Sequence, residues 1–388
     1  MSTSPVSIPK TALDRINVMN PWLGADESRA LAEVIASGWV AQGPKTAAFE
    51  AAFAAHQKVD HAVATSSCTT ALHLALIVAG VKPGDDVIVP SFSFIATANA
   101  PTYVGARPVF ADVDEATGNV TAETLDRALT VATSAVIVVD QGGMPVDLSP
   151  IRRWCDLHGL LLIEDAACAA GSTYRGEPVG RGADVSVWSF HPRKVLTTGE
   201  GGMLTTNNEQ WARRARTLRE HAMGVSAADR HSALVAPAES YAEVGYNFRM
   251  TDLQAAMGLV QLGKLDEMVD RRRLLAEKYR TALAGIPGLR LVADPEHGTS
   301  NFQSCWIEVL PDYPLGREAL LEHLGNMGIS ARRGIMAAHR QPAYAHVAAG
   351  SLPVTERLTD STLILPLYHL LSDHDQRRVI HALANPRG

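Results

Sequence analysis

The chain has 388 residues, of which 46% are hydrophobic and 20% charged, and its formal net charge is −6. Because a single core stops growing at roughly 250–300 residues, this length predicts one large domain and one smaller one, and the mild negative charge excludes a basic surface for nucleic acid. The four cysteines (Cys68, Cys155, Cys168 and Cys305) show no zinc-site or disulfide pattern, and no apolar stretch approaches the ~20 residues of a membrane span, so we expect a cytoplasmic protein without metal.

Short β-rich segments alternate with helical patterns through the first two thirds of the chain. Helices are predicted at 69–80 and 148–159, each with a glycine at or near its end. Several of the predicted strands are almost continuously apolar, which favours an α/β domain with a mostly parallel sheet covered on both faces. The strands are predicted at 61–66, 85–90, 107–113, 134–140, 160–165 and 184–190.

The last third of the chain has a different pattern. One long helix is predicted over 251–286, with a capping box at its start and a proline just beyond its end. It leads into a smaller α+β unit, so the predicted domains are 1–260 and 261–388. The segment 222–245 lacks clear periodicity and predicts a loop near the active site.

Asp165 ends the apolar segment LLLIED, at the sheet edge where open α/β folds bind their ligands. A buried carboxylate needs a partner. Two interpretations stay open at this point. The residue caps a following helix, or it pairs with a protonated ring nitrogen of the kind that pyridinium cofactors carry.

Lys194 lies between two predicted strands in SVWSFHPRKVLTTGEGGMLTT, just before the glycine-rich turn 199–202. Lysines are seldom buried, and a desolvated lysine has a lowered pKa and becomes a nucleophile for carbonyl groups. The glycines would let the backbone pass close to a ligand. The alternative is a hairpin with a solvated lysine at its tip.

Three further segments each supply one part of a cofactor site, and each has a plain structural alternative. The backbone N–H groups of Cys68 and Thr69, at a predicted helix start, can hold a phosphate, although N-capping explains the same residues. Phe94 can stack on a flat ring, although such a residue is more often part of the core. Asn247 and Arg249 precede a helix and can bind an anion, or serve as turn and surface residues.

Taken together and in this order, the segments resemble the DegT/DnrJ/EryC1/StrS aminotransferases from about Trp39 to the C-terminal region. The resemblance implies PLP fold type I, with a mostly parallel seven-stranded sheet flanked by helices in a large domain and a smaller C-terminal α+β domain. It also implies a homodimer with active sites at the subunit interface. The matching motifs are GWVAQGPKTAAFE, SSCTTALHLAL, PGDDVIVPSFSFIATANA, EDAACAAGS, SFHPRKVLTTGEGG and GYNFRMTDLQAA.

The resemblance also implies a role for each matching position. Lys194 holds pyridoxal 5'-phosphate (PLP) as a Schiff base, and Asp165 is the partner of its pyridine nitrogen. Phe94 and Ala167 lie on opposite faces of the ring. The remaining expectations are that Cys68, Thr69 and Ser189 bind the phosphate, that Asn247 reaches it from the neighbouring subunit, that Cys168 lies beside the phenolic oxygen, and that His191, Arg249 and His339 contact substrate.

Three positions depart from the family pattern. Ser67-Cys68-Thr69 stands where Asn-Gly-Thr is frequent, so a Cβ replaces a hydrogen but the backbone donors remain. Cys168 replaces a glutamine, histidine or glutamate and is a weaker hydrogen-bond donor. The segment 139–143 reads VDQGG where many members read VHLYG, which predicts a different substrate pocket.

The sequence therefore predicts a PLP-dependent aminotransferase. It moves an amino group from an amino acid, expected to be L-glutamate, to a keto-sugar that is expected to be nucleotide-linked. A cyclitol ketone is an alternative acceptor that the motifs do not separate from a sugar. The second alternative, a PLP-dependent sugar dehydratase of the same family, has histidine at the position of Lys194, and a non-catalytic scaffold would not need Lys194, Asp165 and a phosphate site together.

Overall fold

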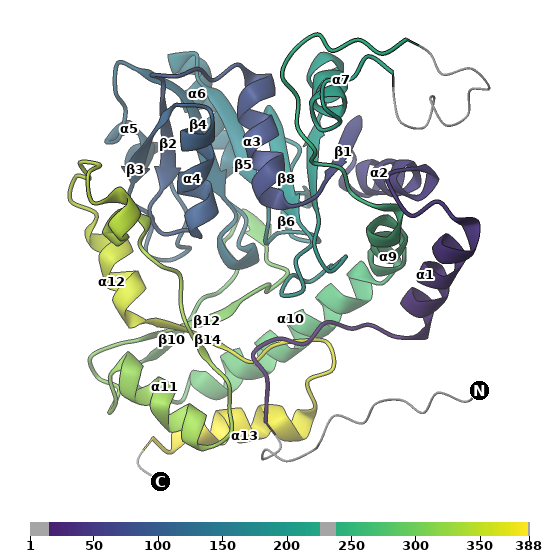
Figure 1. The fold of residues 1–388 in the computed structure, drawn as a ribbon. Helices are drawn as coiled ribbons and strands as arrows, with labels where there is room; N and C mark the ends of the chain where they lie inside the picture. The colour runs from purple at the N-terminus through teal and green to yellow at the C-terminus, as the bar shows by residue number, and fades with distance from the viewer. Residues whose placement is uncertain (1–14, 226–237, 387–388) are drawn as a thin grey trace.

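The computed structural model describes residues 15–225 and 238–386, and its largest element is a seven-stranded sheet (Figure 1). The strand order is β1-β9-β8-β5-β4-β2-β3. Only β9 runs against its neighbours, because it pairs antiparallel with both β1 and β8 while the other pairs are parallel. The mostly parallel sheet is therefore confirmed. Its strands are β1 (His61–Thr65), β2 (Asp86–Pro90), β3 (Arg107–Ala111), β4 (Thr133–Val139), β5 (Leu161–Asp165), β8 (Val185–Ser189) and β9 (Gly202–Thr206).

Helices cover both faces of this sheet, as the continuously apolar strands require. Alternate residues of one strand serve opposite cores: Ile137 of β4 packs toward one set of helices, and its neighbours Val136 and Val138 pack toward the other. One face is covered by α3 (Cys68–Ala79), α4 (Ile95–Tyr103) and α7 (Glu209–Leu218), and the other by α2 (Pro44–Gln57), α5 (Ala122–Asp126), α6 (Leu148–His158) and α9 (Asp252–Gly263).

A second, four-stranded antiparallel sheet lies below the first in Figure 1, in the order β10-β12-β14-β13. One of its faces packs on α10, α11 and α13 through residues such as Ile307 and Leu363. Trp306 belongs to the core of the large sheet instead. The strands of this sheet are β10 (Leu289–Leu291), β12 (Cys305–Val309), β13 (Arg332–Arg333) and β14 (Thr362–Leu365). The helices of this region are α10 (Leu265–Leu283), α11 (Arg317–Asn326), α12 (Pro353–Ser361) and α13 (Asp373–Ala384). A small third sheet contains β6 (Thr173–Tyr174), β7 (Glu177–Pro178) and β11 (Gly298–Thr299).

The single long helix predicted over 251–286 is wrong, because the structure divides it into α9 and α10 at Lys264. The predicted capping box at the start of α9 is confirmed. Two features account for the break. Gly263 has low helix propensity, and the Lys264 ammonium is held 2.7 Å from Glu27 Oε1 and 5.0 Å from the centre of the Trp22 ring. Neither partner is near in sequence, so the local pattern gave no sign of the interruption.

The segment that precedes α1 (Ala25–Ser37) crosses to the small sheet. Ile16 pairs with Ile329, and the Leu367 N–H donates to the Val18 carbonyl at 3.2 Å. The division into domains 1–260 and 261–388 stays a prediction. Part of the predicted loop at 222–245 lies outside the described residues. None of the described helices is long and apolar enough to cross a membrane.

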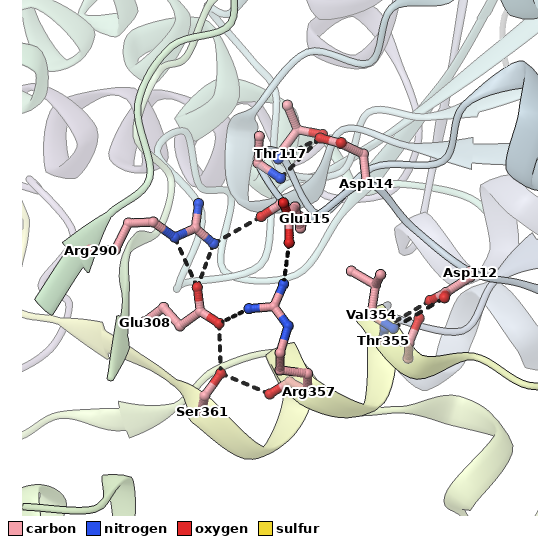
Figure 2. A network of polar contacts seen from close by, with 11 residues as sticks. Asp112, Asp114, Glu115, Thr117, Arg290, Glu308, Val354, Thr355, Arg357 and Ser361 are labelled. Atoms are coloured by element: carbon pink, nitrogen blue, oxygen red, sulfur yellow. Dashed lines mark hydrogen bonds and ion pairs between the residues drawn. The ribbon is translucent and has the colours of Figure 1, made fainter. Parts of the chain in front are cut away.

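Figure 2 shows a polar network that ties the small sheet to the loop after β3. Its centre is Glu308 on β12, which is 1% exposed and accepts hydrogen bonds from Arg290 at 2.6 Å and from Arg357 of α12. Arg357 also donates to the Glu115 carboxylate in that loop at 2.8 Å. The network fixes α12, and with it the following strand β14, against the large sheet.

Candidate active site

A pocket of about 520 Å³ opens where the carboxyl ends of β4, β5 and β8 face the small sheet. Nine of the twelve site residues expected from the sequence line it. The wall of the pocket also includes residues from the N-terminal segment and from β13 and β14. The nine are Cys68, Thr69, Phe94, Asp165, Ala167, Cys168, Ser189, His191 and Lys194.

Asp165 ends β5 and is 5% exposed. Its carboxylate accepts the Thr97 hydroxyl at 3.0 Å and the Ala167 N–H at 3.2 Å. Burial raises the pKa of this carboxyl, and Lys194 and the Thr97 hydroxyl offset only part of that effect, so the pKa stays above its ordinary value. No helix follows β5 directly, so the helix-cap interpretation does not apply. The carboxylate is held as a buried acceptor at the floor of the pocket.

Lys194 lies in the connection between the antiparallel strands β8 and β9, and its side chain is half-buried in the pocket wall. The Nζ atom is 3.0 Å from the Cys168 sulfur, so the alternative of a solvated hairpin tip does not hold. Burial lowers the pKa of Lys194, but the Cys168 and Cys68 sulfurs and the Asp165 carboxylate outweigh burial and leave the pKa above its usual value. The predicted lowered pKa is therefore wrong, because three acidic groups converge on this one amine.

The start of α3 provides both a helix cap and a seat for an anion. Ser67 is the capping residue, and its Oγ accepts the Thr70 N–H at 3.2 Å. The N–H groups of Cys68 and Thr69, in the first turn, have no partner within the helix and point out of its positive end. A Cβ on Gly202 of β9 would lie 2.5 Å from the Cys68 nitrogen, so only glycine lets this strand pass so close. The two interpretations of this segment are thus compatible.

Phe94 precedes α4 and is 65% exposed, which contradicts the core interpretation of this residue. It borders the pocket together with Ala167. An exposed aromatic ring, a buried carboxylate, free N–H groups at a helix start and an amine fit the stacking, charge and covalent needs of PLP. Within the described residues, no group of three or more His, Cys, Asp or Glu side chains is placed to hold a metal ion.

Close packing explains the glycine at position 143 of the VDQGG segment (139–143). Gly143 has a φ of 94°, and a Cβ there would lie 1.9 Å from Asn301 Oδ1. Asn301 in turn donates to the Cys168 carbonyl at 2.8 Å, so it holds the turn that carries this cysteine. Gln141 lines the pocket, and its amide donates to the Phe92 carbonyl at 2.5 Å. The segment that departs from the family pattern thus contributes to the pocket wall through Val139 and Gln141.

Three of the expected residues do not line the pocket in this chain. Asn247 is exposed, and Arg249 is half-buried near the start of α9. His339 lies behind the pocket, where its Nδ1 is 2.6 Å from the Ser91 Oγ and its Nε2 is 3.3 Å from Glu356. These contacts join the end of β2 to α12, so within one chain His339 links the large sheet to this helix.

The pocket also contains residues that were not predicted from the sequence. Thr97 lies one helical turn after Phe94, so the i, i+3 spacing on α4 was a usable signal for it. Val18, Met19 and Arg332 reach the pocket from segments far away in sequence. No local pattern pointed to these three.

The sheet order together with this pocket defines a PLP-dependent aminotransferase of fold type I. A profile of the DegT/DnrJ/EryC1/StrS aminotransferase family matches residues 21–384, and the chain belongs to that family. An aminotransferase, TlmJ, from Streptoalloteichus hindustanus is 40% identical with a TM-score of 0.88, over 95% of this chain and 98% of that one.

Two further solved structures are similar over most of their length. DesV from S. venezuelae, in complex with a ketimine intermediate, is 34% identical with a TM-score of 0.88, over 96% of this chain and 98% of that one. DesI, in the presence of its TDP-sugar product, is 33% identical with a TM-score of 0.85, over 95% of this chain and 91% of that one. The family and these neighbours establish a sugar aminotransferase class for the chain.

Proposed function

We propose that the protein transfers an amino group from L-glutamate to the ketone of a nucleotide-linked keto-sugar and releases an amino sugar. The observation that carries this proposal is the convergence of Lys194, Asp165 and the start of α3 on one pocket. Support for the acceptor comes from DesI, whose structure was analysed in the presence of its TDP-sugar product. The presence of lysine rather than histidine at position 194 favours transamination over dehydration.

PLP, when bound, supplies an electron sink for the carbon next to the transferred nitrogen. We propose that Lys194 holds it covalently, that Asp165 keeps its ring nitrogen protonated, and that the N–H groups of Cys68 and Thr69 bind its phosphate. Phe94 would cover one face of the ring. The 5% exposure of Asp165 excludes water from this carboxylate, which strengthens its interaction with a cation.

We further propose that the Lys194 amine carries the proton of the reaction. Its Nζ would take a proton from the α-carbon of the amino donor and pass it to the cofactor carbon that carries the nitrogen, and it would move a proton in the opposite direction when the acceptor is aminated. The 3.0 Å contact with the Cys168 sulfur holds the amine on the pocket side of the β8–β9 connection. Because Asp165 raises the pKa of Lys194, neutralising that carboxylate with a bound cation would favour the neutral amine that accepts a proton.

A homodimer that forms in the cytoplasm completes the proposal. The exposed side chain of Asn247 is free to reach the phosphate site of a second copy. Light scattering tests this directly, with a mass of twice the chain expected and a monomer mass contradicting it.

The donor half-reaction tests the proposed function. PLP-loaded protein should lose its visible absorbance band on addition of L-glutamate and release one 2-oxoglutarate per active site. A panel of keto-sugars with and without a nucleotide, and a cyclitol ketone, should then restore the band in proportion to turnover. A band that no amino acid removes would contradict the aminotransferase, and recovery only with the cyclitol would contradict the sugar acceptor.

A further inference from the structure

Strand register places Arg332 on a defined face of the small sheet. Arg332 of β13 lies opposite Ile364 of β14, which in turn lies opposite Trp306 of β12. Residues directly opposite in antiparallel strands have their side chains on the same face. Arg332, Ile364 and Trp306 therefore share one face, and Arg333 lies on the other.

The face of the sheet that carries Arg332 looks toward the large sheet. Trp306 packs into the core under β2 and β4, with its ring centre 6.2 Å from that of Phe92. The opposite face, with Leu363, packs on α10, α11 and α13. Arg332 and Ile364 both line the pocket, and Arg333 also reaches it from the edge strand β13.

The two neighbouring arginines differ in their charge partners. Both border the pocket, but the guanidinium of Arg333 is held by the Glu318 carboxylate of α11 at 2.5 Å. Arg332 has no carboxylate within ion-pair distance among residues 15–225 and 238–386. Among the residues that the structure describes, two carboxylates line the pocket: Asp165 at its floor and Glu200, whose Oε1 lies 3.9 Å from His191 Nε2. Within the described part of the chain, Arg332 is thus an exposed cation at the pocket wall without a carboxylate partner.

We propose that the Arg332 guanidinium binds an anionic oxygen group of a substrate. This inference rests on the proposed function, which offers two such groups: the carboxylate of the amino donor and the phosphate of the nucleotide-linked acceptor. A planar guanidinium fork binds either group through two parallel hydrogen bonds. Arg332 does not take part in proton transfer; it determines which substrates are held in the pocket.

The test compares Arg332→Gln with the matched control Arg333→Gln in PLP-loaded protein. The donor arm measures the glutamate concentration that removes half of the cofactor band, and the acceptor arm measures binding of TDP by calorimetry. Since a hydrogen bond to a charged group contributes about 1.5–3 kcal/mol, Arg332→Gln should weaken one arm about tenfold or more. Arg333→Gln should change neither arm by more than about twofold.

The arm in which affinity falls shows whether Arg332 binds the carboxylate of the amino donor or the phosphate of the nucleotide. Arg332→Lys should recover part of the loss, and Arg332→Glu should exceed it, because charge reversal repels the anion. Thermal midpoints equal to the wild type would show that the exposed substitutions leave the fold intact. Unchanged affinity in both arms for Arg332→Gln, with an active wild type, would overturn the inference. A wild type whose band no amino acid removes would instead overturn the proposed function.

Discussion

At the residue scale, three acidic side chains lie buried and close together at or near the floor of the pocket. Asp165 ends β5; Glu164 precedes it on the same strand, and Asp140 directly follows the neighbouring strand β4, and all three are buried. Burial raises the pKa of Glu164 to about 7, and burial beside Glu164 raises the pKa of Asp140 well above its usual value. The sequence pattern singled out Asp165 alone, because the burial of Glu164 and Asp140 depends on tertiary packing that no local pattern encodes.

The raised pKa of Glu164 therefore predicts that the stability of the folded chain depends on pH. Its pKa is about 7 in the folded chain and near the ordinary 4.5 in the unfolded chain, so the folded state binds more protons between these values. Stability should fall as pH rises through this window, by at most about 1.4 kcal/mol per pH unit for one proton. Urea unfolding of the wild type and of Glu164→Gln from pH 4.5 to 7.5 measures this, and a slope identical in both proteins would contradict the assignment.

At the element scale, long-range polar contacts decide what local sequence patterns do not. The six strands predicted in the first two thirds of the chain agree with the structure to within two residues at either end, because their apolar runs and turn residues are local signals. The break between α9 and α10 depends on Glu27 and Trp22, and α12 is capped by Asp112, whose carboxylate accepts the Thr355 N–H at 2.7 Å (Figure 2). No pattern within either helix could predict these contacts.

The polar network around Glu308 predicts how far two substitutions lower the free energy of unfolding. Glu308→Gln removes the only carboxylate paired with Arg290 among the described residues and leaves Arg357 with Glu115 alone. Because Glu308 is 1% exposed, the free energy of unfolding should fall by about 3 kcal/mol. Glu115→Gln is the matched control, because it alters an exposed pair in the same network and should cost less than about 1 kcal/mol. Equal losses in chemical denaturation for the two variants would show that burial of Glu308 does not matter.

At the scale of the whole molecule, the α/β architecture and the family were predictable, because the cofactor segments occur in a fixed order along the sheet. Nine of the twelve expected site residues meet in one pocket, since most of them follow strand ends that the topology brings to a common edge. The part of the pocket wall that the small sheet and the N-terminal segment form could not be predicted from the sequence. Arg332 and the segment at Val18 reach the pocket only through pairing with β14 and Leu367, and strand partners cannot be read from a single short strand.

The proposed function depends on a covalent bond between Lys194 and the cofactor, and chemical trapping of that bond identifies the lysine that forms it. PLP-loaded protein is reduced with borohydride, digested and analysed by mass spectrometry, so that any lysine bonded to the cofactor keeps a phosphopyridoxyl group. The account predicts this group on Lys194, in the segment between β8 and β9. Modification of a different lysine, or no modified lysine in a fully loaded protein, would contradict it.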